Sequence, residues 1–391
     1  MEICKKELCN GCTACANICP KSCITMVADE EGFLRPSVDE SLCVNCGRCG
    51  KICSVVNFGT VENIKTTAYC AINKNDEARK NSTSGGVFTL VSQWVFNQNG
   101  VVFGARYNES FDVVHTRIES LSELSLLRGA KYSQSRLDDC FVQVKSALEE
   151  EKYVLFSGTP CQIGGLVSFL GKEYEKLILV DLICHGVPSP KVWRHYVEYR
   201  CKRDNDGELP ANINLRSKES GWPSYSIRFE YGVDKIYSEL NFKDPFLRGF
   251  VGNFYLRPSC YDCRFKSISR VSDFTLGDFW GVWSQMPQMN DGKGTSLVFL
   301  HSEKARSLWN QISNGLQFLE VDPDESIKEN PSAIVSSSLP KRRKEFFDRY
   351  EKEDFLTLID ELRPIPNPSA FKNRVRQFLG RVKRKILSLI K

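Results

Sequence analysis

The chain has 391 residues, 41% of them hydrophobic and 26% charged, which is ordinary for a soluble protein of two or three domains. Its formal net charge is +5, but residues 364–391 carry eight Lys and Arg and no acidic residue, which leaves about −3 for the rest. The body of the chain therefore lacks the basic excess of a nucleic-acid-binding protein. No run of ~18 apolar residues is present to span a membrane.

Seventeen cysteines are the most unusual feature of the composition. Most of them stand at short, repeated spacings, and no apolar export signal precedes the first of them. Disulfides form in oxidising compartments, whereas thiolates at such spacings bind metals. We therefore expect a cytoplasmic protein whose cysteines are metal ligands.

The first 58 residues, called the head below, contain the same four-cysteine run twice. The pattern C-x2-C-x2-C-x3-C is typical of ferredoxins with two [4Fe–4S] clusters, in which the fourth cysteine of each run binds the other cluster. We expect one cluster on Cys9, Cys12, Cys15 and Cys53, and a second one on Cys43, Cys46, Cys49 and Cys19. Between the two runs, residues 24–36 contain a turn at Glu31 and Gly32 and predict a β-hairpin.

The alternative for the head is a pair of zinc sites. Zinc sites often combine cysteine with histidine, and no histidine lies in this region. Two complete four-cysteine runs therefore favour the ferredoxin interpretation. Cys4 and Cys23 fall outside the runs and are expected to pack as small apolar residues.

After a polar connector, the chain alternates between helical and strand-like patterns. Apolar residues at helical spacing predict a helix over 86–97, and a strand is expected over 101–107. Two short apolar strands, 153–156 and 177–183, flank a helical segment. This arrangement predicts a βαβ unit whose parallel strands are buried on both faces.

Two segments of this region carry groups that suit a phosphate. Ser82, Thr83, Ser84, Gly85 and Gly86 open the first helix, where small residues expose backbone N–H groups and the helix dipole favours an anion. Serine and glycine are also common capping residues, so the segment can equally be structural. The second segment, 128–136, holds three cations and a tyrosine that suit a pyrophosphate and a ring, or it is a solvated loop.

Four later cysteines can form one more metal site. Cys161 follows the first strand of the βαβ unit and Cys184 ends the second, so parallel strands place both at one edge of the sheet, where open α/β sheets bind ligands. Cys260 and Cys263 form a further CxxC pair. The four thiolates can hold an iron–sulfur cluster or a zinc ion. The remaining cysteines have no partner spacing and are expected to pack: Cys70, Cys140 and Cys201.

From residue 66 to about residue 300 the sequence resembles the beta subunit family of coenzyme F420 hydrogenases and dehydrogenases. The segments that carry the resemblance are 82–86 (STSGG), 128–132 (RGAKY), 157–162 (SGTPCQ), 184–189 (CHGVPS), 260–263 (CYDC) and 276–281 (LGDFWG). The resemblance implies an FAD-binding domain at 66–150 and a C-terminal domain at 151–330 with a third [4Fe–4S] cluster. Relatives reduce or oxidise a deazaflavin, and one plant branch reduces a hydroxymethyl chlorophyll.

The resemblance also suggests roles for single residues. Contacts with FAD are implied for residues 82–86, Arg128, Lys131, Tyr132 and Asp278. Lys131 is the candidate cation beside the flavin ring, where it stabilises the reduced anion. His185 is a candidate proton donor, or it is a structural residue next to a cluster ligand. Asp278 lines the substrate pocket or caps a turn.

The last zone, residues 331–391, is expected to be a polar linker followed by a basic amphipathic helix over 370–391. Such a helix lies in a membrane interface or docks on an acidic partner, unless it packs on its own domain. The helix therefore predicts a peripheral position on the inner membrane face as one location of this cytoplasmic protein.

These features predict an α+β ferredoxin-like head, an α/β flavin-binding core with a mixed or parallel sheet, and a C-terminal helical tail. We expect an FAD- and iron–sulfur-dependent oxidoreductase whose FAD exchanges a hydride or two electrons with an organic substrate. The clusters then pass single electrons to or from ferredoxin or a partner subunit. The alternatives are an electron-relay subunit without its own substrate, a reductase of a sugar or polysaccharide intermediate at the membrane surface, and a zinc-scaffolded interaction protein.

Overall fold

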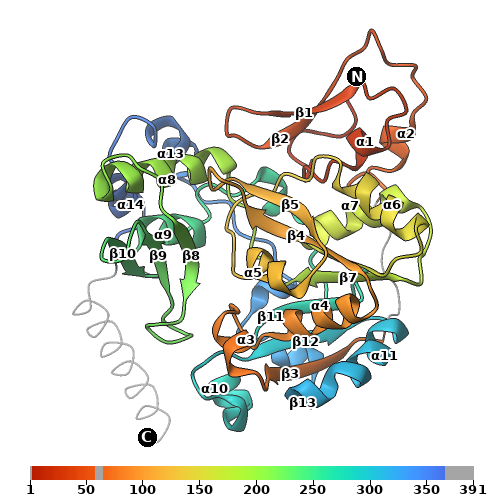
Figure 1. Ribbon diagram of the computed structural model, residues 1–391. Coiled ribbons are helices and arrows are strands. Elements are labelled where there is room, and N and C mark those ends of the chain that lie inside the picture. Colours follow the sequence, from red (N-terminus) through yellow and green to blue (C-terminus); the bar gives the residue numbers. More distant parts are fainter. Residues whose placement is uncertain (1, 58–64, 366–391) are drawn as a thin grey trace, which may run out of the picture.

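The computed structural model describes residues 2–57 and 65–365, which form the head and a larger core behind it (Figure 1). The head consists of one β-hairpin and two single-turn helices. Its elements are β1 (Ile24–Ala28), β2 (Leu34–Val38), α1 (Ala14–Asn17) and α2 (Arg48–Lys51). The two strands pair antiparallel, which confirms the hairpin predicted between the cysteine runs.

One eight-stranded sheet, of order β13-β3-β12-β11-β7-β6-β4-β5, forms the centre of the core. Its strands are β3 (Thr67–Asn73), β4 (Val101–Tyr107), β5 (Val113–Ile118), β6 (Val154–Ser157), β7 (Leu177–Leu182), β11 (Phe274–Asp278), β12 (Ser296–Leu300) and β13 (Leu316–Val321). The four central strands β11, β7, β6 and β4 run parallel, and the outer pairs are antiparallel. The sheet is therefore mixed, and it combines strands from both of the domains predicted at 66–150 and 151–330.

Helices cover both faces of this sheet, which explains why its central strands are almost wholly apolar. On one face, α4 (Val87–Asn97) and α11 (Glu303–Ile312) pack on the sheet. On the other face, α6 (Cys140–Glu149) and α7 (Pro160–Leu170) do so, and the head lies beside them (Figure 1). Shorter helices join the strands: α3 (Asp76–Lys80), α5 (Leu124–Leu127), α10 (Val282–Gln285) and α12 (Pro323–Ser326).

A smaller antiparallel sheet with four helices forms the second part of the core. The strands are β8 (Asn212–Ser217), β9 (Ser226–Glu230) and β10 (Ile236–Leu240), and the helices are α8 (Pro190–Asp204), α9 (Pro245–Val251), α13 (Arg343–Arg349) and α14 (Phe355–Leu362). The last two helices lie in the segment that we predicted as a polar linker. Each helix has apolar residues at helical spacing, Phe346 and Tyr350 in and just after α13 and Phe355 and Leu358 in α14. All four are buried in one cluster, which stabilises both helices.

The structure tests only part of the membrane prediction. Among the described residues, no helix has the length and apolar character that a bilayer crossing requires. The predicted basic helix over 370–391 lies outside the described residues.

The turn before α4 is built around Gly85, which lies between β3 and β12. Its N–H donates to Ser296 Oγ at 2.9 Å, and its carbonyl oxygen accepts from the Asn73 N–H at 2.8 Å. A Cβ atom on residue 85 would lie 2.3 Å from the carbonyl oxygen of Ala71 and 2.7 Å from the backbone nitrogen of Ser296. Both neighbours are backbone atoms of the sheet, so neither can move aside.

We expect Gly85→Ala to lower the free energy of unfolding by about 2 kcal/mol, because the added methyl group overpacks the sheet. Gly232→Ala is the matched control, since no heavy atom lies within 4 Å of a Cβ placed there. The control should change the free energy of unfolding by less than about 0.5 kcal/mol. Chemical denaturation followed by circular dichroism measures both changes, and equal effects of the two variants would contradict the prediction.

Candidate functional site

The candidate site lies along the edge of the large sheet where its parallel strands end. The last residues of β4, β6, β7 and β11 are Tyr107, Ser157, Leu182 and Asp278. Because these strands run parallel, their carboxyl ends meet at the same edge. The segments that follow β6 and β7 at this edge carry Cys161 and Cys184, as predicted from the βαβ unit.

Cys161 and Cys260 are held at this edge by local hydrogen bonds. Cys161 lies in the first turn of α7, and its Sγ is 3.2 Å from Oγ1 of Thr159, the residue that caps the helix. The sulfur of Cys260 accepts from the Val187 N–H at 3.3 Å, which ties the 258–260 turn to the loop after β7. The structure therefore joins two segments that are about 75 residues apart in the chain.

The remaining two cysteines of the core complete the same group. The Cys263 N–H donates to Ser336 Oγ at 2.9 Å, and the Lys266 ammonium donates to the carbonyl oxygens of Cys184 and Ser332. Cys184 and Cys263 each act electrostatically on Cys161 and Cys260, which shows that the four thiols are neighbours.

Burial disfavours the charged form of these thiols. Loss of hydration, together with the charge of the neighbouring thiols, raises the pKa of Cys161 and Cys184 and raises that of Cys260 to about 12. A thiolate at this position therefore needs a bound cation to be stable, which is the chemistry of a metal or cluster ligand. Among residues 2–57 and 65–365, no three His, Cys, Asp or Glu side chains converge closely enough to hold a single metal ion.

The first cysteine set of the head faces the core. Cys9, Cys12 and Cys53 are buried, and Cys12 packs so closely on α7 that a Cβ on Gly165 would lie 2.8 Å from its sulfur. Cys4, which we expected only to pack, donates to both Cys9 and Cys53. These hydrogen bonds lower the pKa of Cys9 to about 5 and that of Cys53 to about 6.

The second cysteine set of the head faces away from the core. One cavity is lined by all four of its members, Cys19, Cys43, Cys46 and Cys49. Cys23, the other cysteine expected to pack, lines the same cavity, with its sulfur 3.3 Å from that of Cys19. Cys46 is exposed to solvent, so this set lies at the outer surface of the head.

Most polar groups of the 82–86 turn already have partners within the protein. Ser82 Oγ donates to the Ala78 carbonyl oxygen at 2.7 Å, and Ser84 Oγ donates to that of Thr295 at 2.8 Å. The Gly85 N–H is also satisfied, as described above. These contacts match the structural alternative for the turn, in which its small residues cap and pack α4.

Lys131 is the most perturbed cation near the sheet edge. Its ammonium donates to the carbonyl oxygens of Leu127 at 3.1 Å and Arg128 at 2.6 Å, and it lies 6.0 Å from the centre of the Tyr107 ring. Loss of hydration lowers the pKa of Lys131 to about 7. It also lowers the pKa of the nearby His115 to about 4.

Four arginines of the core carry buried N–H groups without a hydrogen-bond acceptor among the described residues. These N–H groups are Arg106 Nε, Arg117 Nε, Arg128 Nε, and both Nε and Nη2 of Arg216. Only Arg128 was predicted from the sequence. Arg106 and Arg117 could have been suspected because they interrupt the apolar strands β4 and β5, whereas nothing in the sequence links Arg216 to this region.

Asp278 does not have a free carboxylate, because Arg216 and Trp222 both donate to it. The Arg216 Nη1 donates to one oxygen, and the Trp222 Nε1 donates to the other at 3.2 Å. The Trp222 ring stacks on Trp280 with 5.0 Å between ring centres. Asp278 therefore orients a guanidinium within an aromatic wall at the end of β11.

Tyr132 and His185 both pack against the ring of Phe250. The ring centre of Phe250 lies 4.7 Å from that of Tyr132 and 5.0 Å from that of His185. Nε2 of His185 lies 2.7 Å from Oδ1 of Asn253, and burial lowers the pKa of the imidazole. His185 is thus held in one orientation as a neutral ring.

Comparison with known proteins identifies two parts of the chain. Residues 151–326 match the family model described as the C terminus of the coenzyme F420 hydrogenase/dehydrogenase beta subunit, and residues 8–57 match that of the 4Fe-4S dicluster domain. No curated protein matches the chain. Among solved structures, the chain is similar to one from the F420-reducing [NiFe] hydrogenase complex of Methanosarcina barkeri, studied by xenon derivatization. That likeness has 17% identity and a TM-score of 0.44 and covers 73% of this chain and 90% of that one.

The two family models together span both the head and the loops that carry the four core cysteines. The chain is therefore an iron–sulfur electron-transfer protein of the coenzyme F420 hydrogenase/dehydrogenase beta subunit family, with an N-terminal 4Fe-4S dicluster domain.

Proposed function

We propose that this protein is an FAD-dependent iron–sulfur oxidoreductase that exchanges two electrons with an organic substrate and passes them singly through three [4Fe–4S] clusters. The observation that supports the proposal is that the four core cysteines are neighbours and that Arg106, Arg128 and Arg216 carry buried N–H groups without an acceptor among the described residues. A cluster would bind the cysteines, and an anionic cofactor would accept hydrogen bonds from the arginines.

The residues of this site fit FAD by their chemistry. Buried N–H groups of arginine are costly unless an acceptor satisfies them, and the phosphates of a dinucleotide are strong acceptors. Arg106 and Arg128 would hold those phosphates, and Lys131 and Tyr132 would border the ring. When bound, FAD supplies the exchange of two electrons with a substrate and of one electron at a time with a cluster.

The thiolates fit three clusters. We assign one to Cys161, Cys184, Cys260 and Cys263, one to Cys9, Cys12, Cys15 and Cys53, and one to Cys43, Cys46, Cys49 and Cys19. The first lies in the core, the second at the face of the head that contacts the core, and the third at the outer surface. The exposed third cluster is then the point where ferredoxin or a redox partner subunit docks.

Three further residues would hold a proton or orient a group at this site: Lys131, Asp278 and His185. Lys131 Nζ, whose pKa is about 7, holds or releases a proton near neutral pH and is the group we assign to charge balance beside the flavin. Asp278 keeps the Arg216 guanidinium in place for an anionic group of the substrate. His185 is assigned a positioning role, because Asn253 holds its ring and the ring packs on Phe250.

We expect anaerobic reconstitution to yield about twelve irons per chain if all three clusters form, together with one FAD. The double variant Cys260→Ser/Cys263→Ser should fall to about eight irons, because only the core cluster loses its ligands. Cys201→Ser is the control, since Cys201 is buried in the apolar cluster of the second part of the core. Iron, sulfide and flavin analysis provides the measurement. A wild-type chain with no FAD would contradict the flavoenzyme, and zinc without iron would contradict all cluster assignments.

Lys131 gives a prediction that depends on pH. Its pKa is about 7 in the folded chain and about 10.4 in an unfolded one. Between these values the unfolded chain binds a proton that the folded chain lacks, so the stability of the wild type rises with pH. As the pH falls from 10 to 6, the melting temperature of Lys131→Met should rise relative to that of the wild type. The reason is that the variant has no buried amine to protonate.

The control for this experiment is Lys344→Met, since the Lys344 side chain is 86% exposed. It should show no such pH-dependent difference in thermal unfolding of the FAD-free protein. Saturation with FAD should reduce the effect of Lys131→Met, because a bound anion stabilises the charged lysine. A constant difference between Lys131→Met and the wild type at all pH values would disprove the assigned pKa.

A further inference from the structure

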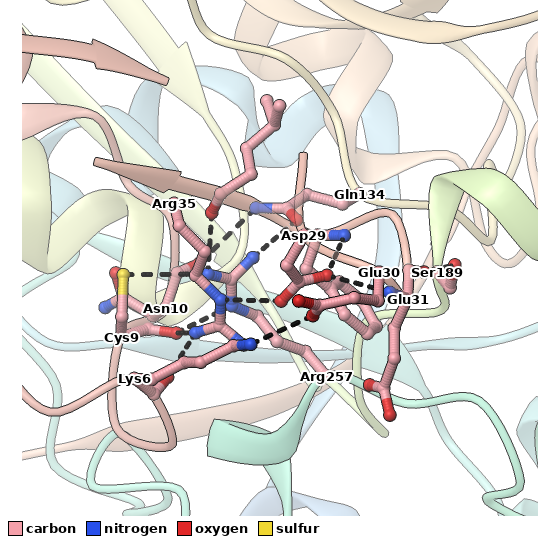
Figure 2. A network of polar contacts seen from close by, with 12 residues as sticks. Lys6, Cys9, Asn10, Asp29, Glu30, Glu31, Arg35, Gln134, Ser189 and Arg257 are labelled. Atoms are coloured by element: carbon pink, nitrogen blue, oxygen red, sulfur yellow. Dashed lines mark hydrogen bonds and ion pairs between the residues drawn. The ribbon is translucent and has the colours of Figure 1, made fainter. Parts of the chain in front are cut away.

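Arg257 is buried between the head and the core and contacts both. It is 1% exposed, and it precedes Cys260 by three residues in the turn that ends at that cysteine. Its Nε donates to the carbonyl oxygen of Cys9 at 2.7 Å, and its Nη2 donates to that of Leu34 at 2.8 Å. Figure 2 shows the guanidinium at the centre of this contact, with Gln134 of the core on its other side.

The guanidinium also contacts a predicted cluster ligand directly. Its Nη2 lies 3.6 Å from the sulfur of Cys9. The guanidinium can lie this close to the head because residue 11, two positions after Cys9, is a glycine. A Cβ on Gly11 would lie 2.8 Å from Arg257 Nη1 and 2.4 Å from Gln134 Nε2. Gly11 also has a φ of +71°, which glycine adopts without strain. The missing Cβ of Gly11 thus leaves room for the Arg257 side chain, and its positive φ is a second reason for a glycine at this position.

The charge of Arg257 is not balanced by a carboxylate among its hydrogen-bond partners in the described residues. Its partners are neutral oxygens and the Cys9 sulfur. Two acidic residues of the hairpin segment pair with other arginines: Asp29 with Arg35 (Figure 2), and Glu31 with Arg343. A buried cation is costly without a counter-charge, and the sulfurs that act on it electrostatically, those of Cys9 and Cys260, would provide one as thiolates.

We propose that Arg257 is a positioning residue that fixes the first head cluster against the core cluster and, through its positive charge, raises the reduction potential of both. The inference rests on the proposed cluster assignments. A cluster with four thiolate ligands gains one negative charge on reduction, and a nearby cation stabilises the more negative state. Hydrogen bonds to the ligand sulfurs act in the same direction.

The test is an anaerobic redox titration of the reconstituted full chain, followed by electron paramagnetic resonance, with iron measured on the same samples. We expect Arg257→Met to keep the iron content of the wild type while shifting the midpoint potentials of the first head cluster and of the core cluster to more negative values. Arg257→Lys, which keeps the charge, should recover most of that shift. A purely structural role would not be rescued by charge alone.

Arg343→Met is the matched control, because Arg343 also joins the head to the core but touches no predicted ligand. It donates to both carboxylate oxygens of Glu31, at 2.6 and 2.5 Å, and to the Leu256 carbonyl oxygen. Its removal should loosen the head without changing the midpoint potentials. An equal shift in Arg343→Met and Arg257→Met would overturn the proposal, since docking alone would then set the potential.

Iron content separates the two ways in which the experiment can fail. Full iron with unshifted potentials in Arg257→Met overturns the role of Arg257 and leaves the proposed function standing. A wild-type chain without head clusters overturns both. Should Arg257→Met lose iron, Arg257→Gln keeps a hydrogen-bond donor without the charge, and equal potentials in this variant and Arg257→Lys would then overturn the proposal.

Discussion

Charge that is buried without a counter-ion from the polypeptide is the constraint on which this structure depends. Taking an ion out of water costs several kcal/mol even after relaxation. Lys131 adapts by a lowered pKa, and the core thiols adapt by raised ones. The arginines cannot release their protons, so they need acceptors. Under the proposed function, both deficits would be met by bound cofactors, because phosphates would satisfy the guanidinium groups and iron would stabilise the thiolates.

The mixed sheet explains how these groups reach one place. Four parallel strands end at a common edge. The backbone groups of the loops that follow them are not paired within the sheet, so they are free to contact a ligand. The antiparallel strands outside them contribute differently. β5 pairs with β4 at one end of the sheet and contributes Arg117. Ser296 of β12 accepts a hydrogen bond from Gly85 and so holds the turn before α4 in place. The second part of the core then closes the site by directing Arg216 from β8 toward Asp278.

The features predictable from the sequence are those set by local spacing. The hairpin, the βαβ unit and the common edge for Cys161 and Cys184 follow from strand periodicity and from the geometry of parallel strands. Arg216 and Arg257 were missed, because their importance comes from contacts with Asp278 and Cys9 that no local pattern encodes. The helices after residue 331 were missed for another reason. Their apolar faces are short and interrupted by charged residues, so composition masked their periodicity.

Cys4 and Cys23 show the limit of motif reasoning most clearly. Each lies outside the four-cysteine runs, yet each contacts members of the predicted ligand sets. Spacing alone cannot place them there, because their positions depend on how the head folds back on itself. Residue type was informative, since a cysteine near a cluster motif is rarely far from the cluster in so small a fold. Cys23 is buried in the apolar cluster of the head, as expected, and its sulfur also lies beside that of Cys19.

The unequal environments of the two head clusters bear on how electrons would cross the interface. Burial favours the less charged, oxidised state of a cluster, so the inner one, held by Cys9, Cys12, Cys15 and Cys53, would be harder to reduce than the exposed outer one. An electron arriving from a partner would then face an uphill step into the core. The positive charge of Arg257 beside Cys9 opposes that effect. Under the proposed assignment, one buried cation therefore keeps the inner cluster accessible to electrons from the outer one without exposing it to water.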